Sequence, residues 1–327
     1  MYQTPDFIKR CAVNPILDGD KVSVRYPAVQ TYNAGITRYN GKYVMIFRND
    51  YGNTKDDFKW ANMRISLGLA TSDDGIRWEV DPEPVLGSLR NEEVRNVYDP
   101  RLTVIDGKCY VCFALNTRHG VCGGIAVTED FSKFDVLSTT APDNRNMVLF
   151  PEKIGGKFMR LERPFPVYSR GGGEKFDIWS SRSPDCRYWG DTALVLGTES
   201  VPYGNSKIGP GAPPVRTPYG WLCTIHAVEN VERELPTWKK PWNKIYYAGL
   251  MLLDLEDPTK VLALAQKPLL VPETEYETDG MRGSVIFPGG MILEDSGEVK
   301  IYYGAADTVE CLATADLGDL LKFVRNE

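Results

Sequence analysis

Charged and polar residues stand beside short apolar segments at five places along this chain, where apolar residues would be expected. They are Arg48 and Asp50, Asp99 and Arg101, Arg163, His226, and Asp307. Carboxyl groups can donate or accept protons in catalysis, whereas arginine and histidine can bind an anion. Any one of them alone would usually be a turn or salt-bridge residue. Their recurrence at a similar position favours one shared polar site, in a fold that brings the five segments together.

A strand-like segment that opens with a glycine and continues with apolar and aromatic residues occurs five times. The copies are residues 40–47, 106–113, 155–161, 219–225 and 296–303. A second segment follows each copy, at residues 67–78, 124–131, 178–189, 250–258 and 312–320. Five strand pairs at irregular spacing, almost without helical patterns, predict an all-β, five-bladed β-propeller. We expect the first strand of each pair, which opens with the glycine, to be the innermost strand of its blade and to line a central channel. The alternatives are an open β-sandwich or two stacked β domains.

The N-terminal part of the chain indicates how such a ring would close. A proline followed by an apolar residue and leucine occurs at residues 15–17, 84–86 and 268–270, and proline there indicates outer edge strands. The first of these segments precedes the first full repeat, and the last repeat lacks one behind it. We therefore expect an N-terminal strand to complete the last blade. No Ser/Gly/Pro-rich or charged linker interrupts the chain, so residues 1–327 are expected to form one domain.

The composition argues against several classes of protein. A net charge of −6 disfavours a nucleic-acid partner, and no run of about 18 apolar residues suggests a membrane span. Seven irregularly spaced cysteines and the lack of an apolar signal segment predict a cytoplasmic protein with reduced thiols. Cys109 and Cys112 form a C-x-x-C pair within an apolar strand pattern. Because no second pair accompanies them, we expect no metal site.

Several motifs resemble those of glycoside hydrolase family 130, the β-mannoside phosphorylases, in order along nearly the whole chain. They are residues 98–101 (YDPR), 144–151 (NRNMVLFP), 163–164 (RP), 207–211 (KIGPG) and 301–308 (IYYGAADT). The resemblance implies a five-bladed propeller that cleaves β-mannosides with inorganic phosphate and inversion, releasing α-mannose 1-phosphate. It implies that Asp99 is the catalytic acid and that phosphate is bound by Arg145, Arg163, Lys207 and His226. It places Asn33, Arg48, Asp50, Arg64, Tyr98 and Asp307 around the mannosyl ring.

The basic residues in this set fit phosphorolysis better than hydrolysis. Inverting hydrolysis needs a second carboxylate that activates water. Phosphate is already an anionic nucleophile and needs instead a group of cations that bind and aim it. Inorganic phosphate is therefore expected as a co-substrate, together with a small carbohydrate substrate and no cofactor.

Other functions and several details stay open at this level. A hydrolase of a related five-bladed family would use Asp50 or Asp307 as its second carboxylate, and a non-catalytic carbohydrate-binding propeller would not need the basic set. We expect a β-1,4 linkage, with β-1,2 as the alternative, and loops at residues 51–60, 117–122 and 229–245 should set linkage and acceptor. Residues 238–244 are either a solvated loop or a lid over the sugar. The glycines at 171–173 suggest a flexible loop, and the loop lengths also allow a homo-oligomer.

Overall fold

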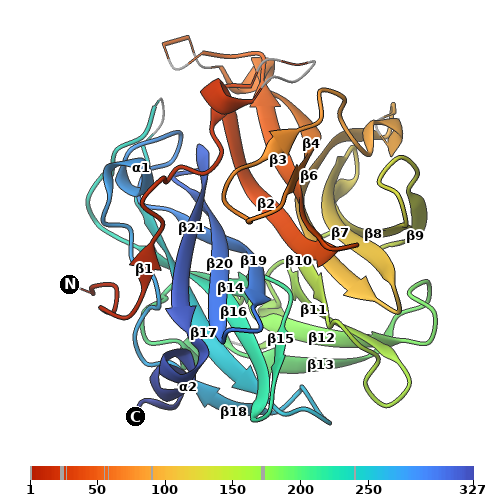
Figure 1. Ribbon diagram of the computed structural model, residues 1–327, viewed down its shortest axis with the longest axis vertical. Coiled ribbons are helices and arrows are strands. Elements are labelled where there is room, and N and C mark those ends of the chain that lie inside the picture. Colours follow the sequence, from red (N-terminus) through yellow and green to blue (C-terminus); the bar gives the residue numbers. More distant parts are fainter. Residues whose placement is uncertain are drawn as a thin grey trace.

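The computed structural model describes residues 2–22, 26, 28–54, 56–57, 59–89, 91–170, 174–238 and 241–327. Within these residues the strands form five small antiparallel sheets that stand side by side around a centre, which is a five-bladed β-propeller (Figure 1). The prediction of an all-β, five-bladed propeller is confirmed. The glycines at 171–173 lie outside the described residues.

The blades follow one another in chain order. Blade 1 contains β2 (Gln30–Tyr39), β3 (Lys42–Tyr51), β4 (Arg64–Ser72) and β5 (Glu79–Val80), and blade 2 contains β6 (Val94–Ile105), β7 (Lys108–Thr117), β8 (Gly120–Thr128) and β9 (Asp135–Thr139). Blade 3 contains β10 (Asn144–Leu149), β11 (Phe158–Pro164), β12 (Ile178–Ser183) and β13 (Gly190–Leu196). Blade 4 contains β14 (Lys207–Pro210), β15 (Val215–Thr217), β16 (Gly220–Asn230), β17 (Lys244–Leu253) and β18 (Val261–Leu264). Blade 5 contains β19 (Ile286–Leu293), β20 (Glu298–Ala305), β21 (Val309–Asp316) and β1 (Lys9–Arg10). The described helices are α1 (Glu275–Thr278) and α2 (Leu317–Arg325), with short 3-10 turns at Gly19–Lys21, Trp60–Asn62, Gly87–Leu89, Tyr168–Arg170 and Thr198–Ser200.

The glycine-led segments of the repeat form the second strand of each blade, not the innermost one as we expected. They are β3, β7, β11, β16 and β20. In blades 1 and 2 the glycine belongs to the hairpin turn that leads out of the innermost strand. The turn residues Asn40–Gly41 and Asp106–Gly107 have φ angles of 50°, 82°, 49° and 77°, typical of type I′ turns. The channel is therefore lined from β2, β6, β10, β14 and β19.

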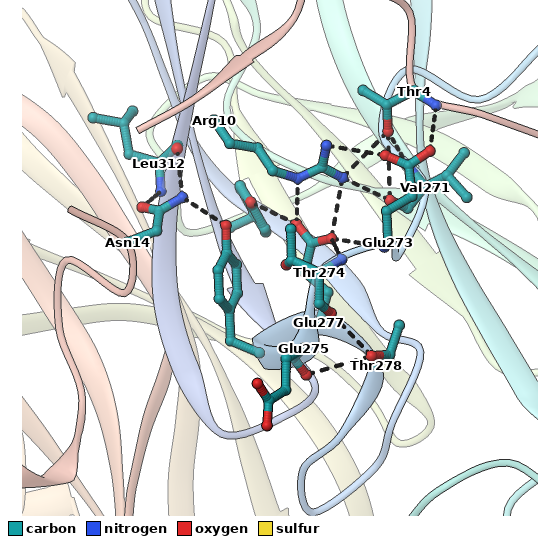
Figure 2. A network of polar contacts seen from close by, with 12 residues as sticks. Thr4, Arg10, Asn14, Val271, Glu273, Thr274, Glu275, Glu277, Thr278 and Leu312 are labelled. Carbon is teal, nitrogen blue, oxygen red and sulfur yellow. Dashed lines mark hydrogen bonds and ion pairs between the residues drawn. The ribbon is translucent and has the colours of Figure 1, made fainter. Parts of the chain in front are cut away.

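The ring closes where the first strand of the chain pairs with the last (Figure 1). β1 joins the outer edge of blade 5, with Lys9 opposite Thr314, so the predicted N-terminal completion is confirmed. Arg10 donates to both carboxylate oxygens of the fully buried Glu277, at 2.8 and 3.0 Å, and to Glu273 at 3.1 Å (Figure 2). These bonds join the first strand to the segment around α1.

The three proline-apolar-leucine segments each touch the third strand of a blade through a single bridge. The pairs are Leu17 with Glu310, Val85 with Leu67, and Leu270 with Ala248. These are edge segments, as the prolines indicate, because a proline cannot donate to a ladder. The outer strands of these blades are the neighbouring segments β1, β5 and β18.

Apolar side chains from neighbouring blades pack together and form the core. Between blades 1 and 2, Ile46 and Leu67 pack with Val97 and Phe113, and each is at most 4% exposed. Burial of one such side chain contributes about 1.5–3 kcal/mol to folding. Because the contacts run between blades, the inner strands are held at a fixed distance from one another.

Arg101 connects three blades at the centre of the ring through hydrogen bonds. Its buried guanidinium donates to the backbone carbonyls of Pro100, Gly211 and Pro288 at 2.7, 2.8 and 3.1 Å, which belong to blades 2, 4 and 5. All of these bonds go to backbone, so Arg101 has a structural role and takes no part in the polar site.

Cys109 and Cys112 are buried in β7, as the apolar strand pattern predicted. Burial raises the pKa of both thiols to about 12. Among the described residues, no group of three or more histidine, cysteine or acidic side chains could hold a metal ion. Within the same residues, no helix is long and apolar enough to cross a membrane.

Candidate active site

Asp99 lies in the wall of a cavity at the centre of the propeller. Its φ of 51° and a register shift between Tyr98 and Arg101 interrupt the pairing of β6 with β7. Aspartate tolerates this left-handed conformation better than most residues do, and a bulge can redirect a side chain. Oδ1 accepts hydrogen bonds from Asn33 Nδ2 at 3.1 Å and Arg48 Nη1 at 3.4 Å. No described residue bonds to Oδ2, which leaves that oxygen for a substrate.

Arg48 is held in place by Asp50. The guanidinium donates to both carboxylate oxygens at 2.8 Å, and it lies over the rings of Tyr32 and Tyr98 at 4.7 and 5.4 Å from their centroids. Tyr32 donates its hydroxyl hydrogen to Asp50 at 3.0 Å. Burial raises the pKa of Asp50, and Arg48 opposes that rise. Asp50 is fully buried and does not line the cavity, so its contact with the site runs through Arg48, which it positions.

Asn33 fixes the direction of Asp99. It has a φ of 52° at a register shift in β2 between Tyr32 and Gly35. On the neighbouring blade, a Cβ at Gly304 would lie 2.3 Å from Asn33 Oδ1, so the amide fits only because that position is a glycine. The hydrogen bond from Asn33 therefore depends on blade 5 as well as on blade 1.

Two arginines stand opposite each other on blade 3. Arg145 in β10 pairs with Arg163 in β11, so their side chains share one face of the sheet. Their guanidinium carbons lie 5.3 and 5.9 Å from the centroid of the Phe165 ring. Lys207 in β14 of blade 4 lines the same cavity. Together Arg145, Arg163 and Lys207 form a group that we call the cationic cradle.

His226 orients Arg163 and adds no charge of its own near pH 7. Its Nδ1 lies 3.2 Å from the carbonyl oxygen of Pro210, which can only accept, so Nδ1 carries the hydrogen. Nε2 can then accept from Arg163 Nη1 at 3.5 Å. Burial, and then the charges of Arg163 and Lys207, lower the pKa of His226 well below its usual range, so the ring is neutral near pH 7.

The cationic cradle has no acidic partner among the described residues. The Nε atoms of Arg145 and Arg163 are buried without a hydrogen bond. Burial, followed by the charge of Arg145, lowers the pKa of Arg163 to about 9, and burial with both arginines lowers the pKa of Lys207 to about 6. Like charges disfavour the charged form of each member. A bound anion would offset this repulsion, so the arrangement is suited to bind an anion.

Blade 5 supplies the remaining carboxylate of the cavity wall. Asp307, with a φ of 50°, accepts from Arg282 Nη1 at 2.9 Å. Four residues that the sequence reasoning missed also line the cavity: Asn146, Tyr246, Arg282 and Phe287. Asn146 stands inside one of the quoted motifs and could have been chosen with its neighbour. Arg282 lies outside any strand pattern, so no local signal marks it.

Most of the predicted site residues line this one cavity of about 80 Å³. They are Asn33, Arg48, Tyr98, Asp99, Arg145, Arg163, Lys207, His226 and Asp307. Arg64 is not among them, because β4 is the third strand of its blade and lies further from the centre. It is exposed and donates to the carbonyls of Ala61 and Met63 at 2.9 and 3.1 Å. The geometry therefore does not support the expected contact between Arg64 and the mannosyl ring.

The tryptophans of residues 238–244 pack beside the cavity wall. Trp242 stacks on Tyr246 with 6.1 Å between ring centroids, and its Nε1 donates to Gly283 O at 2.8 Å. Trp238 packs against Tyr32, whereas residues 239 and 240 lie outside the described residues. Both indoles are therefore packed against other side chains, and a lid over the sugar stays a prediction.

Comparison with known proteins gives full-length matches. A family model for beta-1,4-mannooligosaccharide phosphorylase matches residues 4–326. The beta-1,4-mannooligosaccharide phosphorylase of Ruminococcus albus is 31% identical, and the match covers 98% of this chain and 92% of that protein. The 1,2-beta-oligomannan phosphorylase of a Thermoanaerobacter species is 29% identical, covering 96% and 98%. The solved structure of beta-1,2-mannobiose phosphorylase from Listeria innocua gives a TM-score of 0.84 at 26% identity, covering 98% and 99% of the two chains.

Proposed function

This chain belongs to glycoside hydrolase family 130, and we propose that it cleaves a β-mannoside by inverting phosphorolysis and releases α-mannose 1-phosphate. The observation that carries the proposal is the cationic cradle, which has no acidic partner in the part of the chain that the structure describes and lies in the same cavity as Asp99. An uncompensated group of cations binds a multiply charged anion strongly.

The chemistry needs one acid and one nucleophile. A phosphate oxygen held by the cationic cradle attacks the anomeric carbon, and the bond from that carbon to the glycosidic oxygen breaks. The proton of Asp99 goes to the leaving oxygen, directly or through a sugar hydroxyl. Attack from the face opposite the leaving group inverts the configuration. Arg48, Asn33 and Tyr98 would hold the mannosyl ring on the other side of the cavity.

The other carboxylates are poorly placed to activate water. Both carboxylate oxygens of Asp50 accept hydrogen bonds from the Arg48 guanidinium. One carboxylate oxygen of Asp307 accepts a hydrogen bond from Arg282. A general base must face the water molecule from which it accepts a proton, but Asp50 does not line the cavity and Arg282 already occupies one oxygen of Asp307. This disfavours the hydrolase alternative, which would need Asp50 or Asp307 in that role.

We propose a β-1,4-linked substrate, supported by the family model and by the Ruminococcus relative. A β-1,2-linked mannoside is the second candidate, because the Listeria innocua structure, which is similar over nearly the whole chain, has that specificity. We also propose a cytoplasmic location, supported by seven cysteines that form no disulfide among the described residues.

The test is sugar release from β-1,4-mannobiose, β-1,2-mannobiose and mannosyl-glucose, with and without inorganic phosphate. We expect mannose 1-phosphate only when phosphate is present, and fastest from the β-1,4 substrate. Free mannose formed equally well without phosphate would overturn phosphorolysis. Faster release from β-1,2-mannobiose would overturn the linkage and leave the reaction type in place.

A further inference from the structure

Glu310 is a fully buried glutamate at the boundary between blades 5 and 1, and it does not line the cavity. It belongs to β21, the third strand of blade 5, and pairs with Gly304 of β20. β21 is in contact with β2, the innermost strand of blade 1, and the two lie side by side in Figure 1. Burying a carboxyl group is costly unless it makes hydrogen bonds, so the partner of Glu310 indicates its role.

The side chain of Glu310 holds the bulge of β2. Its Oε2 accepts a hydrogen bond from Ala34 N at 3.0 Å. Ala34 lies within the register shift between Tyr32 and Gly35, where the pairing of β2 with β3 is interrupted. A bulge leaves backbone groups without a ladder partner, and Ala34 is fully buried, so its N–H needs a partner within the protein. The carboxyl oxygen of Glu310 takes the place of the missing strand partner.

The bulge directs a side chain of the cavity wall. Asn33 precedes Ala34, has the left-handed φ of 52°, and donates to Asp99 Oδ1 at 3.1 Å. Blade 5 also approaches the bulge closely from another strand, because a Cβ at Gly289 would overlap the carbonyl oxygen of Ala34. Without the hydrogen bond to Glu310, the bulge could rearrange, and the amide of Asn33 would move with it.

The protonation state of Glu310 suits this role. Burial raises its pKa to about 8, against the hydrogen bond from Ala34 and the charge of Arg101, so the carboxyl group is mostly protonated near pH 7. A protonated carboxyl group keeps a carbonyl oxygen that accepts, as Oε2 does. Oε1 is buried without a hydrogen-bond partner in the described part of the chain. Glutamine has the same shape and the same acceptor, so it can replace Glu310 and keep the bond.

We propose that Glu310 is a positioning residue for the catalytic acid: it holds the bulge of β2, and the bulge aims Asn33 at Asp99. The proposal deepens the proposed phosphorolysis and rests on it. Glu310 acts from blade 5 through two links, the Ala34 hydrogen bond and the Asn33 amide. The cationic cradle lies on blades 3 and 4, so phosphate binding should not depend on Glu310.

Two substitutions separate the hydrogen bond from the bulk of the side chain. Glu310→Gln keeps the acceptor, whereas Glu310→Met has a similar length without one. Because a small displacement of a catalytic group can cost up to about 100-fold, we expect Glu310→Met to lower kcat about 30-fold and Glu310→Gln to stay within about threefold of the wild type. KM for phosphate should change less than about twofold in both. Arg10→Met breaks a buried ion pair in the same blade and is the control for lost stability, with kcat unchanged.

A double-mutant cycle tests whether Glu310 acts through Asn33. Asn33→Gly removes the amide, and glycine adopts the positive φ of this position without strain. In the Asn33→Gly background, Glu310→Met should lower kcat less than about threefold. An equal loss in both backgrounds would mean that Glu310→Met only reduces the amount of well-folded enzyme, and it would overturn the proposal. Wild-type kcat in Glu310→Met, or a Glu310→Gln protein as slow as Glu310→Met, would overturn it too.

Hydrogen exchange of the Ala34 amide separates this proposal from the proposed function, because it needs no turnover. The amide should exchange at similar rates in the wild type and Glu310→Gln, and about tenfold or more faster in Glu310→Met. The amide of Ile46, opposite Gly35 in the same sheet, is the internal reference and should not change. If the wild type releases no mannose 1-phosphate, phosphorolysis fails, and this order of exchange rates would still support Glu310 as the residue that holds the bulge. Equal Ala34 exchange in the three proteins would overturn that role.

Discussion

Replacing Lys207 by methionine should weaken phosphate binding strongly at pH 6 and hardly at pH 8. The ammonium group is surrounded by Arg163 and Arg145, and burial together with these charges lowers its pKa to about 6. One hydrogen bond to a charged group contributes about 2 kcal/mol, which is about 30-fold in affinity. Only the protonated lysine provides it. With half of the lysine protonated at pH 6 and about 1% at pH 8, the variant should bind about 15-fold more weakly at pH 6 and about equally at pH 8.

The assay is calorimetric titration of both proteins with phosphate at pH 6, 7 and 8. Phosphate itself titrates in this range, but it does so equally for both proteins, so the ratio of their dissociation constants reports on Lys207 alone. A ratio that stays constant from pH 6 to 8 would refute the reasoning, because it would mean that the lysine remains charged throughout.

Unfolding gives an independent check on the same pKa. The folded-state pKa of Lys207 lies below the unfolded value of about 10.4, so the unfolded state holds more protons between pH 6 and about 10. Stability of the wild type relative to Lys207→Met should therefore rise with pH across that window. If the urea midpoints of the wild type and of Lys207→Met changed in parallel with pH, they would contradict the low pKa of Lys207.

Three other substitutions test the assigned roles. Asp99→Asn should fold normally and lose about 10²–10⁴-fold in kcat, and a variant with most of its activity would remove Asp99 from the mechanism. Arg64→Ala should stay within about threefold of the wild type in kcat/KM with the disaccharide, because among the described residues its guanidinium bonds to the nearby carbonyls of Ala61 and Met63; a loss of about 100-fold would place it at the sugar site. Arg10→Met should lower the free energy of unfolding by about 3 kcal/mol, because Glu277 keeps a buried charge without its partner. Arg38→Met breaks a half-exposed ion pair with Glu294 and should lower the free energy of unfolding by less than about 1 kcal/mol. Similar urea midpoints for Arg10→Met and Arg38→Met would therefore argue against a large contribution of the buried pair.

The repeat could be recognised in the sequence because the residues that mark it belong to short turns and strands. A glycine or asparagine with positive φ is needed wherever a two-residue turn leads from an innermost strand, as at Asn40–Gly41 and Asp106–Gly107. The strands inside those turns carry less regular patterns, since bulges at Asn33 and Asp99 interrupt their alternation. For that reason the glycine-led segments were mistaken for the innermost strands.

The site was predictable as a set of residues and less so as a set of roles. Asp99 and Arg145 stand in motifs that resemble a known family, and the structure brings them to one cavity. The placement of Arg64 depends on which strand of its blade is innermost, and this is a property of the whole ring. The neutral state of His226 depends on burial and on Arg163 in another blade, and its tautomer depends on the Pro210 carbonyl. Such long-range neighbours leave no trace in local spacing.

The closure of the ring constrains the order in which the protein can be made. Asn14 bonds to Leu312, and the two residues are 298 positions apart, so the segment around Asn14 must wait for its partner strand until those further residues have been made. At about 5–20 residues per second, this delay is roughly 15–60 s. The first four blades can assemble on the ribosome during that time, whereas the fifth is completed only after β21 has been made. Nascent chains stalled before β21 should therefore leave residues 2–17 open to protease, and full-length chains should protect them.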